Sequence, residues 1–182
     1  MNNPQKTDAM WKVIQRIDGY VGSAQTKATA VLAFNAFQGS AIAVKAYEIS
    51  TFFSEVAWLK TAALFLILIS TVGLLVSTIW SLRSLLPNRS SSSGRKRSHI
   101  FFMDIAADQN CENFTSRLEA CSEDEFASDL ATQVFELSGI LRSKYDRLET
   151  AMNAMVWFQI TPLVLLLLLK IGAVASRAIN HY

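Results

Sequence analysis

The sequence has few of the residues from which catalytic and metal sites are built. Its 182 residues include two cysteines and two histidines, and their spacing matches no metal-binding pattern. It also lacks a glycine-rich phosphate-binding loop and a nucleophile elbow. The acidic group of residues 123–125 falls in a predicted first helical turn, where carboxylates favour the helix dipole. These observations argue against an enzyme, and they predict no metal and no resident cofactor.

Charge is also scarce. Charged residues make up 18 % of the chain, against about 25 % in soluble domains. The formal net charge of +2 is too small to indicate nucleic-acid binding. Hydrophobic residues reach 51 %, and they collect in long runs, which is typical of a membrane protein in contact with the lipid bilayer. Residues 1–27 contain no apolar core of a signal peptide.

Two of these runs predict membrane-spanning helices, at residues 61–82 and 151–170. The first is uncharged, and the second ends at Lys170; each is long enough to cross a hydrocarbon core of about 30 Å. Residues 28–46 predict a third, marginal span, bounded near its ends by Lys27 and Lys45 and rich in small residues. The alternative for this segment is a helix that lies in the membrane interface.

The distribution of lysine and arginine predicts the topology. These residues are frequent in segments 1–27 and 83–150 and sparse in segments 47–60 and 171–182. By the positive-inside rule, the first pair of segments is cytoplasmic and the second pair is extracytoplasmic. We therefore expect a multi-pass protein of the bacterial inner membrane.

Helical signals fill the polar segments as well. Residues 1–27 have an amphipathic pattern that continues toward residue 28 without a proline. After a Ser/Gly-rich linker at residues 87–98, Asn110 is a predicted N-cap, and Ser122 with Glu125 has capping-box spacing. The helix that follows has no strong breaker before the last span. The predicted fold class is an all-α membrane protein, with about three transmembrane helices and a small cytoplasmic helical bundle inserted between the second and the last.

Polar residues inside the predicted spans are candidates for function. Asn35, Gln38 and Gln159 either form hydrogen bonds between helices or line a pore once several copies of the chain associate. Pro162 removes a backbone hydrogen bond and predicts a kink that could act as a hinge in the last span.

Two features of the polar segment are candidate ligand-binding elements. The basic cluster of Arg89, Arg95, Lys96 and Arg97 either holds the loop inside the cell and contacts anionic lipid, or binds a phosphate-bearing ligand. Asp104 interrupts an apolar strip and needs a partner if it is buried. One interpretation pairs it with Arg142, Lys144 or Arg147; the other gives it a role in ligand binding.

An ordered set of short motifs resembles a known family. The set begins with Lys27–Ala28 and Asn35, continues with Pro87 and the stretch IFFMDIA at residues 100–106, and ends with Glu136–Leu137 and Lys144–Tyr145. Together these motifs resemble the transmembrane effectors of Pycsar anti-phage systems, over about residues 11–155. The chain departs from the family in a longer serine-rich linker and in Met103, where a small residue is expected.

The resemblance implies a function. A partner cyclase would sense infection and make cyclic CMP or cyclic UMP, and the effector would respond by impairing membrane integrity, so that the cell dies before phage mature. A homo-oligomer is expected. The residues assigned to ligand binding, from charge and resemblance together, are Arg89, Arg95, Lys96, Arg97, Asp104, Lys144 and Tyr145.

Two other functions are compatible with the residues alone. A holin-like or toxin-type membrane protein would permeabilise the membrane without a ligand. A structural membrane adaptor would use its helical bundle to dock a partner protein.

Overall fold

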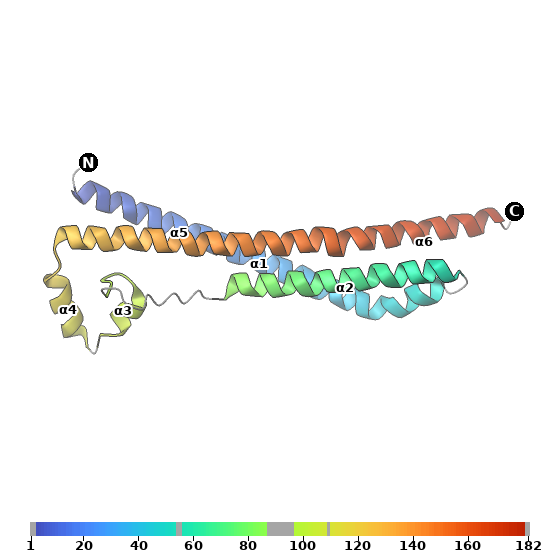
Figure 1. Cartoon of the computed structure of the whole chain (residues 1–182), viewed down its shortest axis with the longest axis horizontal. Helices are drawn as coiled ribbons and strands as arrows, with labels where there is room; N and C mark the ends of the chain where they lie inside the picture. The colour runs from blue at the N-terminus through green and yellow to red at the C-terminus, as the bar shows by residue number, and fades with distance from the viewer. Residues whose placement is uncertain (1–2, 54–55, 87–96, 109, 181–182) are drawn as a thin grey trace. The chain divides into compact units, whose positions relative to one another are not determined.

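A computed structural model describes residues 3–53, 56–86, 97–108 and 110–180, and the all-α prediction is confirmed, because no strand occurs in these ranges. The elements are drawn in Figure 1. In chain order they are α1 (Asn3–Phe52), α2 (Ala57–Leu85), α3 (Phe102–Ala106), α4 (Cys111–Glu119), α5 (Glu123–Ala154), the π-helical segment η1 (Met155–Ile160) and α6 (Thr161–Asn180).

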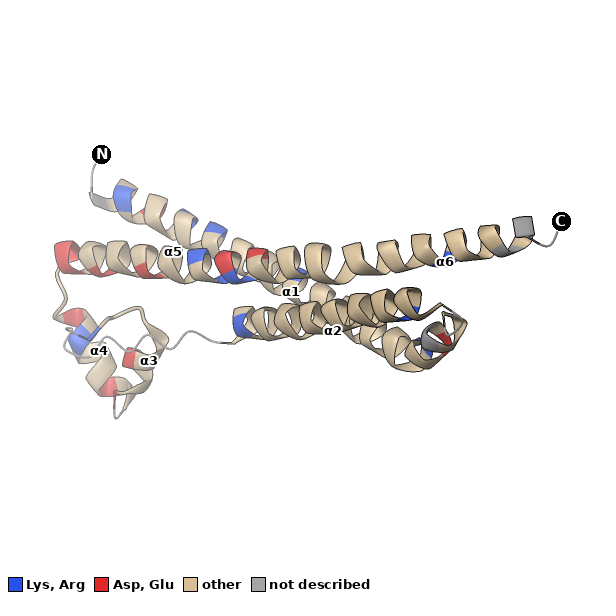
Figure 2. Cartoon of the chain, turned by 45° about the vertical axis from the view of Figure 1, so that its right-hand side comes forward, with Lys and Arg blue, Asp and Glu red and all other residues tan. Residues whose placement is uncertain are grey.

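The chain divides into two compact units. The polar unit comprises residues 1–23 and 87–144, and the membrane unit comprises residues 24–86 and 145–182. Helices α1 and α5 each contribute residues to both units. Figure 2 shows that charged residues are frequent in α4 and α5, whereas α2 and the segment from η1 into α6 are almost free of them.

Two helical stretches are long and apolar enough to cross a membrane. They are Ala57–Leu85 and the continuous helical stretch Glu123–Ser176, and just 22 % and 17 % of their most apolar windows are buried. A core helix of a soluble protein would be mostly buried, so this exposed apolar surface is that of helices in lipid. The segment at residues 28–46 does not meet the same criterion, and its crossing of the membrane stays a prediction.

Helix ends follow the local signals in the sequence. The side chain of Asn110 accepts a hydrogen bond from the Asn113 N–H at 2.8 Å, which confirms the predicted N-cap of α4. Ser122 and Glu125 form the predicted capping box, in which each side chain accepts a hydrogen bond from the other residue's backbone N–H. Helix α1 continues past residue 46, where the predicted first span ends, and stops at Phe52.

One face of α2 consists of small residues. Its buried positions are Ala63, Ser70, Gly73, Ser77, Ser81 and Ser84. Most of them recur at intervals of three or four residues, so they lie on one side of the helix. Small side chains allow helix backbones to approach closely inside a membrane. The neighbour at the centre of this face is η1: a Cβ atom added to Gly73 would lie 2.5 Å from the Phe158 Cβ and 2.7 Å from its carbonyl oxygen.

The π-helical segment η1 ends at Ile160, two residues before Pro162. The Thr161 N–H donates to the Val156 carbonyl, five residues earlier, and the Thr161 Oγ1 donates to the same oxygen at 2.9 Å. A proline ring collides with the carbonyl four residues before it in a regular α-helix. The wider π-turn is a known way for a helix to absorb such a disturbance. The structure therefore has an irregularity in the last span, at η1, just before the proline from which a kink was predicted.

Cations lie over aromatic rings near both ends of the apolar stretches. The Arg83 guanidinium lies 5.2 Å from the centre of the Trp80 ring, and the Lys170 Nζ lies 5.3 Å from the centre of the Phe52 ring. Such pairs are stabilising, and they suit the membrane interface, where an aromatic ring and a charge both find favourable surroundings.

Replacement of Gly73 by alanine tests the close contact between α2 and η1. The added methyl group would overlap the backbone of Phe158, so the helices must separate, at a cost of about 1–3 kcal/mol in unfolding free energy. Gly172→Ala is the control, because nothing lies within 4 Å of its added Cβ. Thermal unfolding in detergent should show a lower midpoint for Gly73→Ala alone; equal midpoints would contradict the packing described here.

Candidate functional site

A cluster of buried amides and hydroxyls joins three elements of the membrane unit. The Gln159 Nε2 in η1 donates to the Asn35 Oδ1 of α1 and to the Gly73 carbonyl of α2, both at 3.2 Å. The Asn35 Nδ2 in turn donates to the hydroxyls of Ser77 and Thr78, both at 3.1 Å. The amide cluster therefore ties α1, α2 and η1 together.

The orientation of the Gln159 amide follows from its contact with backbone. The Gly73 carbonyl can only accept a hydrogen bond, so the Gln159 group beside it is the NH₂. The Asn35 atom that meets the same NH₂ is then its carbonyl oxygen. This leaves the Gln159 Oε1 buried, and no donor among the described residues reaches it.

Gln38 extends the cluster along α1. Its Nε2 donates to the Ser70 Oγ at 3.3 Å, and the Ser70 hydroxyl donates to the Gln159 carbonyl at 3.4 Å. The Gln38 Oε1 and the Ser81 Oγ also have no partner within the described part of the chain. A buried polar atom left without a hydrogen bond costs about 1–3 kcal/mol. The cluster is thus held together by hydrogen bonds and still has unused hydrogen-bonding capacity.

The residues predicted to line a pore are buried in this conformation. Asn35, Gln38 and Gln159 are each at most 4 % exposed, and Pro162 is buried as well. Their hydrogen bonds are to other residues of the same chain. In this structure these amides connect the helices of one molecule; a pore lining formed by several copies stays a prediction.

In the polar unit, charged side chains hold the short segment that follows the linker. The Ser98 N–H donates to the Asp104 carboxylate at 2.9 Å, and the His99 N–H donates to the Asp129 carboxylate at 2.7 Å. On the carbonyl side, the Arg117 Nη1 donates to the carbonyls of Arg97 and Ser98 at 3.4 Å and 3.0 Å. The peptide groups that join Arg97 to Ser98 and Ser98 to His99 are therefore each bound both through the N–H and through the C=O.

Arg117 also takes part in a bridge between two guanidinium groups. Its Nη2 lies 2.7 Å from one oxygen of the Asp108 carboxylate, and the Arg97 Nη1 lies 3.3 Å from the other. The Asp108 side chain is 7 % exposed, and the Arg97 side chain is 59 % exposed. Neither Arg117 nor Asp108 was among the predicted site residues, because neither belongs to a charge run or to one of the resembling motifs.

The predicted ligand-binding residues fall in different places. Arg89, Arg95 and Lys96 lie outside the described residues, and Arg97 takes part in the bridge. Asp104 accepts a hydrogen bond from the Ser98 N–H. Arg147, one of the three cations proposed for it, donates to the Arg83 carbonyl near the end of α2.

The last two predicted ligand-binding residues are neighbours in α5 but belong to different units. Lys144 is buried in the polar unit. Tyr145 belongs to the membrane unit, where the Lys27 Nζ lies 5.9 Å from the centre of its ring. The resembling motifs Lys27–Ala28 and Lys144–Tyr145 therefore meet in space through Lys27 and Tyr145.

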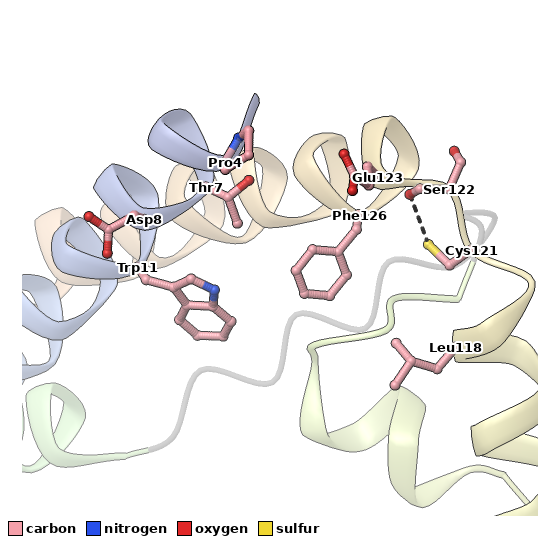
Figure 3. A pocket seen from close by; sticks show the side chains of 9 residues that line it. All are labelled: Pro4, Thr7, Asp8, Trp11, Leu118, Cys121, Ser122, Glu123 and Phe126. Carbon is pink, nitrogen blue, oxygen red and sulfur yellow. Dashed lines mark hydrogen bonds between the residues drawn. The ribbon is translucent and has the colours of Figure 1, made fainter. Parts of the chain in front are cut away.

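The polar unit also contains a cleft of about 550 Å³ (Figure 3). The rings of Trp11 and Phe126 project into it from α1 and α5, and Leu118 of α4 closes another side. The residues that line it include the acids Asp8 and Glu123 and no lysine or arginine. The cleft is large enough for a small molecule, but its charge does not suit a phosphate.

These features define a class of protein: an all-helical membrane protein that has apolar helices with an internal amide cluster, and a separate charged helical unit. Comparison with known proteins makes the assignment specific. Residues 9–171 match the family described as the Pycsar effector protein domain, and the chain belongs to this family. It is also 25 % identical, over 146 residues, to the Pycsar effector protein EcPycTM of Escherichia coli, with 79 % of each chain covered. No solved structure gives a significant match.

Replacement of Gln159 by leucine tests the amide cluster. The change removes the donor to Asn35 and Gly73, and it leaves two buried acceptors without that partner, so we expect a loss of about 1–3 kcal/mol per acceptor in unfolding free energy. Asn153→Leu, an exposed amide on the same helical stretch, is the matched control. Unfolding by a denaturing detergent measures both variants; equal stability of the two would contradict a structural role of the cluster.

Proposed function

We propose that this protein is the membrane effector of an anti-phage system. A cyclic pyrimidine mononucleotide, cyclic CMP or cyclic UMP, made by a partner cyclase activates it, and the active form impairs the integrity of the bacterial inner membrane. The observation that carries the proposal is the family match, which covers residues 9–171 and hence most of both units. The two apolar helical stretches support the membrane as the site of action.

The amide cluster supports a mechanism for the loss of membrane integrity. In the closed state, α1, α2 and η1 bury polar groups against one another. If these helices separate, water can hydrate the same groups, including the three oxygens that have no partner among the described residues. A polar path across the apolar layer would then form from residues that are internal in the closed state. Oligomers of the opened chain would enlarge it.

The ligand supplies the free energy for opening through a difference in affinity. A nucleotide that binds the open state more tightly than the closed state shifts the population toward the open state, and a ligand with equal affinities shifts nothing. The proposed topology places the polar unit in the cytoplasm, where a cyclase releases its product. The arginine-rich character of segment 83–150 supports this orientation.

Dye entry into cells tests the proposed function. Cells that express the protein should admit a membrane-impermeant DNA dye when an active pyrimidine cyclase is expressed with it, and they should exclude the dye when the cyclase carries a catalytic substitution. Dye entry in both cases would identify a ligand-independent toxin. If the dye stayed outside in both cases while a stoichiometric protein partner co-purified, a structural adaptor would be the correct assignment.

Accessibility of a single cysteine tests the polar path. The two natural cysteines, Cys111 and Cys121, are first replaced by serine, and Gln38→Cys is then introduced. Gln38 is 4 % exposed, so a charged thiol reagent should modify the new thiol in liposomes after cyclic nucleotide is added and not before.

Phe37→Cys is the control for this experiment, because Phe37 is 74 % exposed on the neighbouring, apolar side of α1. A thiol in contact with lipid does not ionise readily and should stay unmodified in both states. Equal modification at the two positions, or none at position 38 in the presence of nucleotide, would contradict the proposed path.

A further inference from the structure

We propose that Arg97 and Arg117 form the phosphate site for the cyclic nucleotide, and that the Asp108 carboxylate occupies this site in the ligand-free protein. The inference rests on the proposed function and specifies its binding site. The contact that carries it is the bridge in the polar unit, where each oxygen of one carboxylate meets a different guanidinium group, at 2.7 Å and 3.3 Å.

The chemistry of the two anions makes the exchange possible. A carboxylate carries one negative charge on two oxygens. The phosphodiester of a 3′,5′-cyclic nucleotide likewise carries one negative charge on two free oxygens. Guanidinium groups bind both anions through paired N–H donors. A nucleotide could therefore replace Asp108 without a change in the net charge of the site.

Arg117 has a donor available for the larger anion. Its Nη2 is bonded to Asp108, whereas its Nε is buried and has no acceptor among the residues that the structure describes. The N–H of Nε and one N–H of Nη2 point in the same direction, along the edge of the guanidinium that binds oxyanions in a bidentate manner. Asp108 contacts one nitrogen of this edge, Nη2. A phosphate in its place could accept from both atoms.

The other carboxylates nearby lie on the far side of the backbone. Asp104 and Asp129 accept hydrogen bonds from the N–H groups of the peptides 97–98 and 98–99, and Arg117 binds the C=O groups of the same two peptides. The N–H and the C=O of a trans peptide point in opposite directions. The backbone therefore separates the two acids from the guanidinium of Arg117, and Asp108 is the acid that competes with a ligand.

The site also connects the ligand to the linker. Arg97 and Ser98 directly follow the basic segment, and Arg117 binds their carbonyls. When the nucleotide displaces Asp108, the turn after α3 that carries Asp108 is released from Arg117. The carbonyls of Arg97 and Ser98, at the end of the linker, remain bound to Arg117. Binding would thus change the position of α3 relative to the end of the linker, within the polar unit.

Two substitutions with opposite expected effects on the affinity for cyclic CMP distinguish this site from a purely structural ion pair. Asp108→Asn keeps the size of the side chain and removes the competing charge, so cyclic CMP should bind more tightly. Arg97→Gln removes a phosphate ligand from an exposed position, so cyclic CMP should bind more weakly. Hydrogen bonds to charged groups contribute about 1.5–3 kcal/mol, which corresponds to a change in Kd of about tenfold or more in each direction.

The experiment is calorimetric titration of the full-length protein in detergent with cyclic CMP, and in parallel with cyclic UMP. Glu119→Gln and Arg142→Gln are matched controls, because both residues are exposed in the polar unit and the changes alter the net charge equally. We expect opposite shifts for the two test variants and unchanged Kd values for the controls. A melting curve of each variant verifies that it is folded; if Asp108→Asn were unfolded, Arg97→Gln would decide alone.

Two results would overturn the inference, and they are distinguishable. If the unaltered chain binds nucleotide but Asp108→Asn binds it no more tightly, or Arg97→Gln no more weakly, the phosphate site lies elsewhere and the proposed function stands. If the unaltered chain binds neither nucleotide, the proposed function fails, and this site fails with it.

Discussion

The carboxamide of Gln159 is the interaction on which the organisation of the membrane unit depends. It reaches the Asn35 side chain, 124 positions earlier in the chain, and the backbone of Gly73 in a third helical element. In an apolar environment no water is present to replace these partners, so each of them depends on this one side chain. This contact requires the face of small residues on α2, because Gly73 lets η1 come close enough for the Gln159 amide to reach the Gly73 carbonyl.

The polar unit follows a different principle. Its short helices α3 and α4 have no buried residues, and charged side chains bind backbone groups directly, as Arg117, Asp104 and Asp129 do at Ser98 and His99. Such contacts depend on charge and on the order of the residues along the peptide. The two units thus differ in what holds them together: hydrogen bonds between amides and hydroxyls in the membrane unit, and contacts of charged side chains with backbone in the polar one.

Local signals allowed much of the fold to be predicted. Asn110, Ser122 and Glu125 act within one helical turn, so their roles could be read from spacing, and the uncharged runs at residues 61–82 and 151–170 indicated the two apolar helices. The partners of Asn35 and Gln159 could not be predicted, because spacing within one helix does not say which helix lies beside it. The face of Ser70, Gly73 and Ser77 was present in the sequence as a regular interval of small residues, and this interval was the available signal for the cluster. For Asp104 the sequence left a cation partner and a ligand role open; the Ser98 N–H that it binds leaves no mark in the sequence.

The π-helical segment has a consequence for how related chains should be aligned. From Lys144 to Leu166, buried positions in the last long helical stretch recur at intervals of three or four residues, except for the step of five from Ala154 to Gln159 across η1. A π-turn is equivalent to one residue inserted into an α-helix. A relative that lacks one residue between these two positions could therefore form an ordinary α-turn and still present its amide to the same neighbours. Length differences of a single residue at this point need not change which side of the helix faces the interior.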